Sequence, residues 1–323
     1  MQKILIIKLG ALGDVVMATS LIKQIQSHHK NDEIWLLTSP AFKDIFNNWE
    51  GIKLATFNRK GINNFFRTLF WIRKKHFDYI YDLQSNDRTS FLCGLSGVSK
   101  IIGNHPRFPY DIHPRDEYTG QCHIYERMLQ VLESAGIKAS RLLPTLELNE
   151  SEKNHVISWL NKEGLADRKF IIIHAGASKN HPEKCWPYFL ELATSLSKAG
   201  YIIVWIGSDD EVDLNRKNSN TTGIDASNLF SIKEISELGK HAAFAITNDS
   251  GPMHVLSSSG IPVYSFFGPT NWRRNHAINQ EKNILSCETL SVITKHDVGP
   301  DRNQLSKISV DSVIAKIRHD GYL

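Results

Sequence analysis

The stretch 245–270, AITNDSGPMHVLSSSGIPVYSFFGPT, places an acid, a Ser-Gly-Pro turn and a histidine between two apolar runs. A helix that begins at about Met253 would direct the free N–H groups of its first turn, and the positive end of its dipole, toward a ligand beside this turn. Phosphates and carboxylates bind at such places. The alternative is that the same residues only form the turn between a strand and a helix. The candidates for an anion site are Asp249, Ser250, Gly251, Met253 and His254.

A second acid, Asp14, lies in the stretch KLGALGDVV. Gly10 and Gly13 allow the backbone to approach a ligand, and Asp14 stands where the following helix should begin. Either its carboxylate caps that helix or it faces a substrate hydroxyl. The spacing of the two glycines is too short for the dinucleotide fingerprint GxGxxG, and an acid there would repel a pyrophosphate. A nicotinamide oxidoreductase is therefore disfavoured.

Two further turns carry charged residues after apolar runs, HAGASKNHPEKCWP and WIGSDDEVD. In the first, Lys184 is either a solvated surface lysine or a point charge that neutralises a phosphate beside Ser178. In the second, three acids that end at Glu211 either cap a helix or accept hydrogen bonds from ribose hydroxyls. Together with His254 and a helix dipole of about half a charge, Lys184 would offset much of the charge of a diphosphate.

These turns need strands and helices to position them, and the hydrophobic pattern predicts both. Apolar runs alternate with stretches at helical period, which is the pattern of βαβ units and parallel sheets. The predicted strands are 3–9, 33–39, 79–84 and 100–104 in the first half, and 169–176, 201–208, 244–249 and 262–268 in the second. A helix over 13–28 and another from about Ser151 are also predicted. Ligands bind at the carboxyl ends of strands in such sheets, where all four turns lie.

Length and composition suit a globular protein with two domains. The chain has 323 residues, of which 41% are hydrophobic and 22% charged. A proline-containing stretch at 142–149 is the predicted boundary, so the domains are 1–149 and 150–323. The four cysteines show neither a CxxC pair nor metal-ligand spacing, which argues against a disulfide framework and against a zinc site.

Charge and hydropathy limit location and partners. The N-terminus has a short apolar run without a cleavage site and no segment is long enough to span a membrane, so we predict a cytoplasmic protein. A net charge of +4 and the lack of a recognition motif predict no nucleic-acid partner. The segment 52–77 carries seven basic residues and no acidic one, interleaved with aromatic and aliphatic residues. It is either a core-packed helix with a solvated basic face, or a surface that receives an acidic lipid-linked sugar and rests on an anionic leaflet.

Together these motifs resemble glycosyltransferase family 9, the bacterial heptosyltransferases that extend the lipopolysaccharide inner core from ADP-heptose. The stretches KILIIKLGALGDVV, FDYIYDLQ and HIYERMLQVLESAGI resemble its N-terminal signature, its central strand and its interdomain helix. NDSGPMH followed by FFGPT resembles its most specific C-terminal signature. The resemblance implies a GT-B fold, an α/β architecture of two Rossmann-like domains with parallel sheets facing across a cleft. The first domain would bind the acceptor and the second the nucleotide sugar, with the C-terminal helix packing back on the first domain.

The resemblance also implies an inverting mechanism and a role for each candidate residue. Asp14 matches the general base that takes the proton of the acceptor hydroxyl, and either Glu211 or Asp210 matches the acid that binds the ribose. The implied donor-binding residues are Ser178, Lys184, Glu211, Asp249, Ser250, Gly251, Met253 and His254. The implied acceptor-binding residues are Gly13, Arg59, Lys60 and Arg88.

No metal or separate cofactor is implied, because the nucleotide sugar, ADP-heptose, is itself a substrate. The resemblance further implies a monomer at the cytoplasmic face of the inner membrane, acting on a lipid-linked acidic saccharide. Family members usually have a longer passage before the NDSGPMH strand, near the base of the nucleotide, and residues 227–236 of this chain lack it. Three alternatives stay open: a family member with another nucleotide sugar, a sugar-nucleotide epimerase of similar fold, and a non-catalytic envelope-assembly protein. An epimerase should carry paired carboxylates around the sugar, and a non-catalytic protein has no reason to keep Asp14, Lys184 and NDSGPMH.

Overall fold

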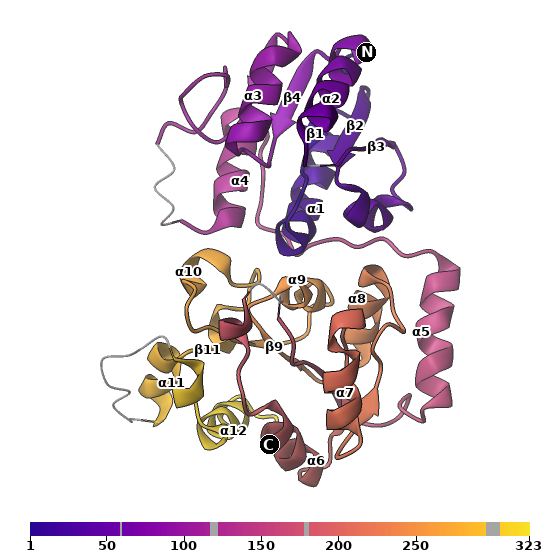
Figure 1. Cartoon of the computed structure of the whole chain (residues 1–323), viewed down its shortest axis with the longest axis vertical. Coiled ribbons are helices and arrows are strands. Elements are labelled where there is room, and N and C mark those ends of the chain that lie inside the picture. The colour runs from indigo at the N-terminus through magenta and orange to yellow at the C-terminus, as the bar shows by residue number, and fades with distance from the viewer. Residues whose placement is uncertain (59, 117–121, 178–180, 295–303) are drawn as a thin grey trace. The chain divides into compact units, whose positions relative to one another are not determined.

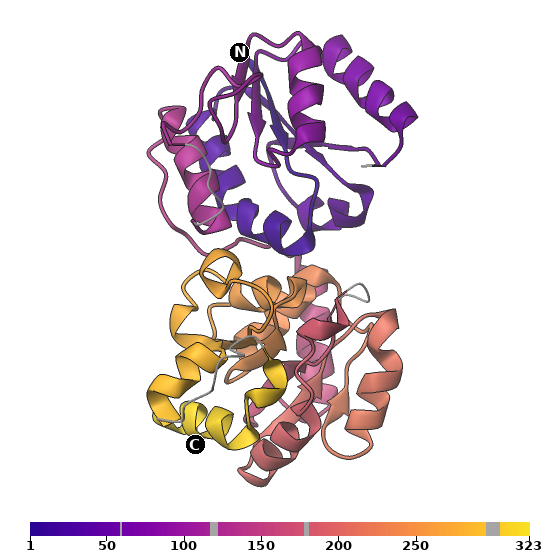
Figure 2. The ribbon, with the colours of Figure 1, turned by 60° about the vertical axis from the view of Figure 1, so that its left-hand side comes forward.

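The structure is a computed structural model that describes residues 1–58, 60–116, 122–177, 181–294 and 304–323. The chain divides into two compact units, Met1–Glu147 and Leu148–Leu323. Each unit is a parallel sheet covered by helices (Figures 1 and 2). The prediction of two α/β units with parallel sheets is therefore confirmed.

In the described part of the first unit, five strands form one sheet in the order β3-β2-β1-β4-β5, and every neighbouring pair is parallel. The strands are β1 (Lys3–Ile7), β2 (Glu33–Thr38), β3 (Ile52–Thr56), β4 (Tyr79–Asp82) and β5 (Lys100–Ile102). Strand β1 reads as an unbroken apolar run because it lies at the centre, buried on both faces. Strand β3 was missed because it is an edge strand with an exposed lysine, so its pattern is only partly apolar.

The helices of this unit are α1 (Leu12–His28), α2 (Ile62–Lys75), α3 (Asp87–Ser96) and α4 (Ile124–Ser134), with a short 3-10 helix η1 (Pro40–Phe46). Helices α2 and α3 pack together and share one apolar cluster with strand residues Leu5 and Ile7. Helices α1 and α4 also pack on each other. Helix α1 buries the apolar stripe that its periodicity predicted.

In the described part of the second unit, six parallel strands follow the order β11-β10-β9-β6-β7-β8. They are β6 (Phe170–His174), β7 (Ile202–Trp205), β8 (Ile224–Asp225), β9 (Ala245–Asn248), β10 (Val263–Phe266) and β11 (Ile284–Leu285). The four long strands confirm the predicted ones. The edge strands β8 and β11 were missed because two residues are too few to form an apolar run.

The helices of the second unit begin with α5 (Glu150–Lys162), where Asn149 accepts the Glu152 N–H in a capping box. The others are α6 (Phe189–Lys198), α7 (Val212–Ser219), α8 (Ile232–His241), α9 (Gly251–Ser257), α10 (Trp272–Asn275), α11 (Cys287–Thr294) and α12 (Val310–His319). The described residues of this unit also form four 3-10 helices: η2 (Pro182–Lys184), η3 (Asp209–Glu211), η4 (Glu281–Asn283) and η5 (Leu305–Lys307). Among the described residues, no helix combines the length and the apolar character needed to cross a membrane.

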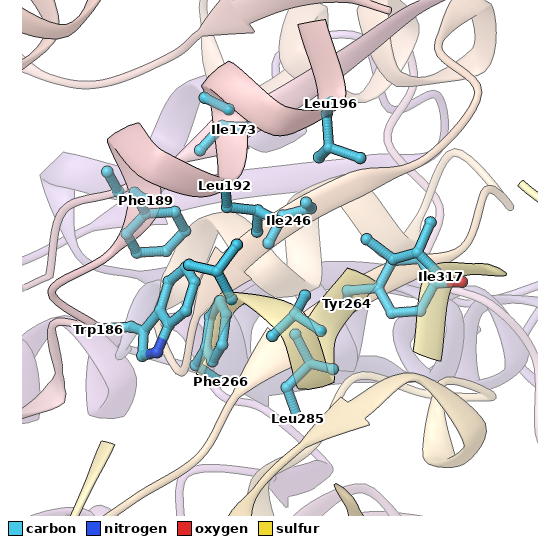
Figure 3. Close-up of a cluster of buried hydrophobic side chains, with 14 of the residues drawn as sticks. Ile173, Trp186, Phe189, Leu192, Leu196, Ile246, Tyr264, Phe266, Leu285 and Ile317 are labelled. Atoms are coloured by element: carbon cyan, nitrogen blue, oxygen red, sulfur yellow. The ribbon is translucent and has the colours of Figure 1, made fainter. Parts of the chain in front are cut away.

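A core cluster of the second unit lies between its sheet and helices α6 and α12 (Figure 3). Trp186 stacks on Phe266 with ring centroids 4.1 Å apart, and its indole N–H donates to the Ile308 carbonyl at 2.9 Å. Ile317 of α12 belongs to the same cluster. Trp186 therefore fixes the chain directly after Lys184 to the core of the unit.

Candidate active site

The four turns singled out in the sequence lie at the carboxyl ends of β1, β6, β7 and β9. Neighbouring parallel strands end at one edge of their sheet, so β6, β7 and β9 bring three of these turns together in the second unit. The turn after β1 lies in the first unit. Each unit therefore has one edge at which candidate residues gather.

Asp14 lies in the first turn of α1, but it does not cap that helix. The helix begins at Leu12, and the N-cap position belongs to Ala11, which provides no side-chain cap. The interpretation of Asp14 as an N-cap is therefore wrong, because the helix already begins two residues before Asp14. Its side chain is 30% exposed, and Oδ2 lies 4.0 Å from Nζ of Lys8. The carboxylate is thus accessible and has a cation beside it.

Lys8, which sequence reasoning missed, is buried at the end of β1. Its Nζ donates to the Leu83 carbonyl at 3.1 Å. Burial lowers the pKa of Lys8, while the carboxylates of Asp14 and Asp82 act in the opposite direction. The sequence signal for Lys8 was its position directly after an unbroken apolar run, where a side chain is expected to be buried. A buried lysine is rarely found without a carboxylate nearby, so this position also indicated a neighbouring acid.

The loop after β1 is tied to the loop after β4 by one side chain. Gln84 Oε1 accepts hydrogen bonds from the backbone N–H groups of Leu9 at 2.9 Å and Gly10 at 3.1 Å. Asp82, at the end of β4, is fully buried and accepts from the Tyr110 hydroxyl at 2.7 Å. Burial raises the pKa of Asp82, while its hydrogen bonds favour the carboxylate. These contacts hold the β4 loop in a defined position relative to Asp14.

A cavity of about 460 Å³ opens at the same edge of the first sheet. Its lining mixes hydroxyl, amide, imidazole and guanidinium groups with two exposed aromatic rings. The lining residues are Ser85, Asp87, Ser90, Phe91, Asn104, His105, Arg107 and Phe108. Burial lowers the pKa of His105, and the charge of Arg107 acts in the same direction. Sequence reasoning missed this cavity, because its residues come from Ser85, from helix α3 and from the loop after β5, which only the fold brings together.

Of the acceptor residues implied by the resemblance, Gly13, Lys60 and Arg88 are not among the described residues that line this cavity. Gly13 is buried in α1, and Lys60 is exposed just before α2. Arg88 donates to the Gly61 carbonyl at 2.7 Å and lies over the ring of Phe65. Arg59 falls outside the described residues. Arg88 therefore holds the start of α2 against α3.

In the second unit, Lys184 pairs with Asp249. Nζ of Lys184 lies 2.8 Å from Oδ2 of Asp249, which also accepts from the Thr270 hydroxyl at 2.6 Å. The Lys184 side chain is 22% exposed, whereas Asp249 is buried. Asp249 thus joins the turn after β6 to the turns after β9 and β10, and Lys184 lies at the surface of this cluster.

Asn248, which sequence reasoning also missed, connects the end of β9 to the turn after β6. This fully buried residue donates through Nδ2 to the carbonyls of Ala175 and Gly176, at 2.9 and 3.0 Å. Its Oδ1 accepts from the Trp186 N–H at 3.0 Å. All three hydrogen bonds hold backbone groups, so Asn248 is a structural residue of the site. The signal was an amide at the end of a buried strand, next to Asp249.

Glu211 turns inward and is engaged through both oxygens. Oε1 lies 3.1 Å from Nε2 of the buried His174, and Oε2 accepts from the Ser208 N–H at 2.7 Å. Burial opposes ionisation, but the hydrogen bonds of His174 and Ser208 outweigh it and lower the pKa of Glu211 to about 2. Asp210, the other candidate for the ribose, is exposed.

The Glu211 pair predicts a pH dependence of stability. Because its pKa is lower in the folded than in the unfolded protein, its contribution is present above about pH 4.5 and is lost as the pH falls toward about 2. We expect the free energy of unfolding to decrease over this range, and less steeply in Glu211→Gln. Urea unfolding at a series of pH values measures this. Glu191→Gln, at an exposed position on α6, should keep the wild-type slope, and equal slopes in all three proteins would contradict the prediction.

Gly176 leaves room for the Glu211 carboxylate. A Cβ at this position would overlap Oε1 of Glu211. We expect Gly176→Ala to destabilise the protein by about 1–3 kcal/mol, because the carboxylate must leave His174 or the backbone must shift. In the double variant with Glu211→Ala most of this penalty should vanish. A double-mutant cycle from urea unfolding measures the coupling, and additive effects would rule out the proposed overlap.

The turn after β9 positions the remaining candidates. Ser250 is the N-cap residue of α9, which begins at Gly251, slightly earlier than predicted. The side chain of Met253 is fully buried in a core cluster, so the group that Met253 could offer a ligand is its backbone. His254 is also buried, and Ser178 falls outside the described residues. In the described ranges, no group of three or more His, Cys, Asp or Glu could hold a metal ion.

Comparison with known proteins gives a consistent result. A family model, glycosyltransferase family 9 (heptosyltransferase), matches residues 65–299. Lipopolysaccharide heptosyltransferase 1 of Campylobacter coli is 24% identical over 323 aligned residues, which cover 91% of this chain and 92% of that protein. The sequence similarity thus extends through both units.

Solved structures that include the following two share the fold. A glycosyl transferase of family 9 from Veillonella parvula has a TM-score of 0.82 at 23% identity, covering 98% of this chain and 96% of its own. The Escherichia coli ADP-heptose lipopolysaccharide heptosyltransferase II has a TM-score of 0.76 at 18% identity, covering 98% of both chains. The predicted GT-B fold class is confirmed by this likeness.

Proposed function

Because the chain belongs to glycosyltransferase family 9 (heptosyltransferase), we propose that it transfers a heptose from ADP-heptose to an acidic saccharide of the lipopolysaccharide inner core, a Kdo or a heptose, with inversion. The observation that carries this proposal is Asp14, an accessible carboxylate at the edge of the first sheet beside the buried Lys8. Asp14 would be the general base.

In the proposed reaction, the acceptor hydroxyl oxygen forms a bond to the anomeric carbon of the donor. The bond between that carbon and the diphosphate oxygen breaks, and ADP leaves with the electron pair. Asp14 takes the hydroxyl proton. One base and a stabilised leaving group are sufficient, so no covalent nucleophile is required.

The donor would bind at the edge of the second sheet. Lys184 would supply a positive charge to the diphosphate, for which it must share or leave its contact with Asp249. Ser178, Ser250, Gly251, His254 and the backbone of Met253 would complete the phosphate and sugar contacts. Glu211, rather than the exposed Asp210, would accept from the ribose, because both of its oxygens are already oriented by His174 and Ser208.

The acceptor would bind in the first unit. Its cavity lies at the same sheet edge as Asp14 and combines polar groups with aromatic rings, which is the usual lining of a small-molecule site. Gly13, Arg59, Lys60 and Arg88 are proposed to assist, chiefly by attracting an acidic acceptor. Since that acceptor is lipid-linked, we further propose that the enzyme acts as a monomer in peripheral contact with the cytoplasmic face of the inner membrane.

A donor panel tests the proposed reaction. The enzyme is incubated with ADP- and UDP-linked sugars and an inner-core acceptor, and release of nucleoside diphosphate is followed. We expect fastest release from ADP-heptose, only with acceptor present, and an inverted anomeric configuration in the product. Release without acceptor, together with a free or epimerised sugar, would instead support a sugar-nucleotide epimerase. Binding without turnover of any donor would support a non-catalytic envelope-assembly protein.

A further inference from the structure

An apolar strip on the surface of the first unit has no role in the proposed reaction. On α2, Ile62, Phe66 and Phe70 are 64%, 46% and 63% exposed, and their spacing of four residues aligns them along one side of the helix. On α3, Phe91 and Leu95 are 65% and 47% exposed at the same spacing. Contiguous exposed apolar surface of this kind marks an interaction site.

The two helices form one continuous surface. They pack against each other, and Arg73 near the end of α2 donates through Nε and Nη2 to the Leu95 carbonyl, at 2.9 and 2.6 Å. The buried side of α2 is anchored in the core by Leu69 and Ile72. The five exposed residues Ile62, Phe66, Phe70, Phe91 and Leu95 are called the α2–α3 ridge below. Because both helices are fixed to the sheet, the ridge does not need to fold on binding.

The charges beside the ridge indicate what it contacts. Arg67 and Lys74 are exposed on α2. Arg67 directly follows Phe66, and Lys74 lies one helical turn after Phe70. No acidic residue occurs between residues 52 and 77. Two copies of this chain that met through their ridges would bring these like charges together, which disfavours a dimer. A surface with anionic headgroups above a hydrocarbon layer matches both features.

We propose that the α2–α3 ridge inserts into the boundary between headgroups and acyl chains of an anionic phospholipid bilayer, with Arg67 and Lys74 on the headgroups. This goes beyond the charge-based contact predicted from the sequence, because the apolar side chains enter the lipid. The ridge is continuous with the acceptor cavity, since Phe91 belongs to both. The inference that the ridge brings this cavity to a lipid-linked acceptor rests on the proposed function.

Vesicle flotation with the full chain tests the insertion. Wild type should float with vesicles that contain phosphatidylglycerol and much less with vesicles of phosphatidylcholine alone. We expect Phe66→Gln/Phe70→Gln to lower partitioning about tenfold or more, through lost apolar burial. Arg67→Gln/Lys74→Gln should lower it about thirtyfold on anionic vesicles, at about 1 kcal/mol per cation. Leu214→Gln, at a 42% exposed leucine of α7, is the matched control and should float like wild type.

The results separate the ridge from the proposed reaction. On a deacylated, soluble acceptor, Phe66→Gln/Phe70→Gln should keep wild-type kcat/KM, which also shows that the variant is folded. Loss of flotation with this activity retained supports the proposal. Unchanged flotation of that variant, equal flotation on both vesicle types, or a wild-type dimer that the variant converts to a monomer would overturn it. Absence of transfer by wild type would count against the proposed function alone.

Discussion

Replacing Asp14 by Asn should lower kcat by about 10²–10⁴-fold while the protein still folds and binds donor. The amide cannot accept the proton of the acceptor hydroxyl, but it keeps the size and hydrogen-bonding geometry of the carboxylate. The fold should survive because Lys8 keeps its hydrogen bond to Leu83. The Asp82 carboxylate also remains as a group that favours the charged form of Lys8.

Initial rates with saturating donor, together with calorimetric titration of ADP, measure this effect. Asp44→Asn provides the control, since Asp44 is an exposed acid on η1 of the same unit. It should retain wild-type kcat. Normal turnover by the Asp14 variant would remove Asp14 as the base. If the Asp14 variant lost ADP binding to the same extent as kcat, Asp14 would instead be assigned to donor binding or to the fold.

If Lys184 binds the donor diphosphate as proposed, replacing it by Met should lower kcat/KM for the donor by about 10²–10³-fold, because a positive charge is lost where the departing diphosphate develops its negative charge. The dissociation constant of ADP should rise, and its dependence on salt concentration should weaken, since the lost interaction is ionic. Calorimetric titrations of ADP at low and high salt, with steady-state kinetics, measure both.

The Lys184 variant also leaves the buried Asp249 with the Thr270 hydroxyl as a remaining partner, so some loss of stability is expected. Urea unfolding separates this loss from the loss of binding. Lys198→Met, at an exposed position on α6, is the matched control and should change neither quantity. Destabilisation with unchanged ADP affinity would make Lys184 a purely structural partner of Asp249.

The local pattern was enough to predict the central strands and the turns that carry candidate residues. Strands such as β1 and β6 contain unbroken apolar runs because both of their faces are buried. The periodicity of α1 likewise predicted its buried side. The turns were recognisable because Gly, Pro, Ser and Asp mark the ends of such elements. The family followed from these turns, because its signatures lie in them.

The capping interpretation of Asp14 failed because the start of a helix depends on where the backbone turns, which for α1 is at Leu12. The edge strand β3 was missed because it is half-exposed and only partly apolar, and β8 and β11 were missed because two residues are too few to form an apolar run. The start of α1 and the pairing of these edge strands both depend on contacts with residues distant in sequence.

What the sequence alone determined about this protein is its fold class, its family and the turns in which a base and a cation would be found. All of these depend on residue type and spacing along the chain. Only the tertiary structure showed that Lys8 lies beside Asp14, that Lys184 pairs with Asp249, and that Phe66 and Phe70 of α2 face outward. Pairing and exposure depend on which surfaces the sheet and helices cover, and that is set by packing among distant segments.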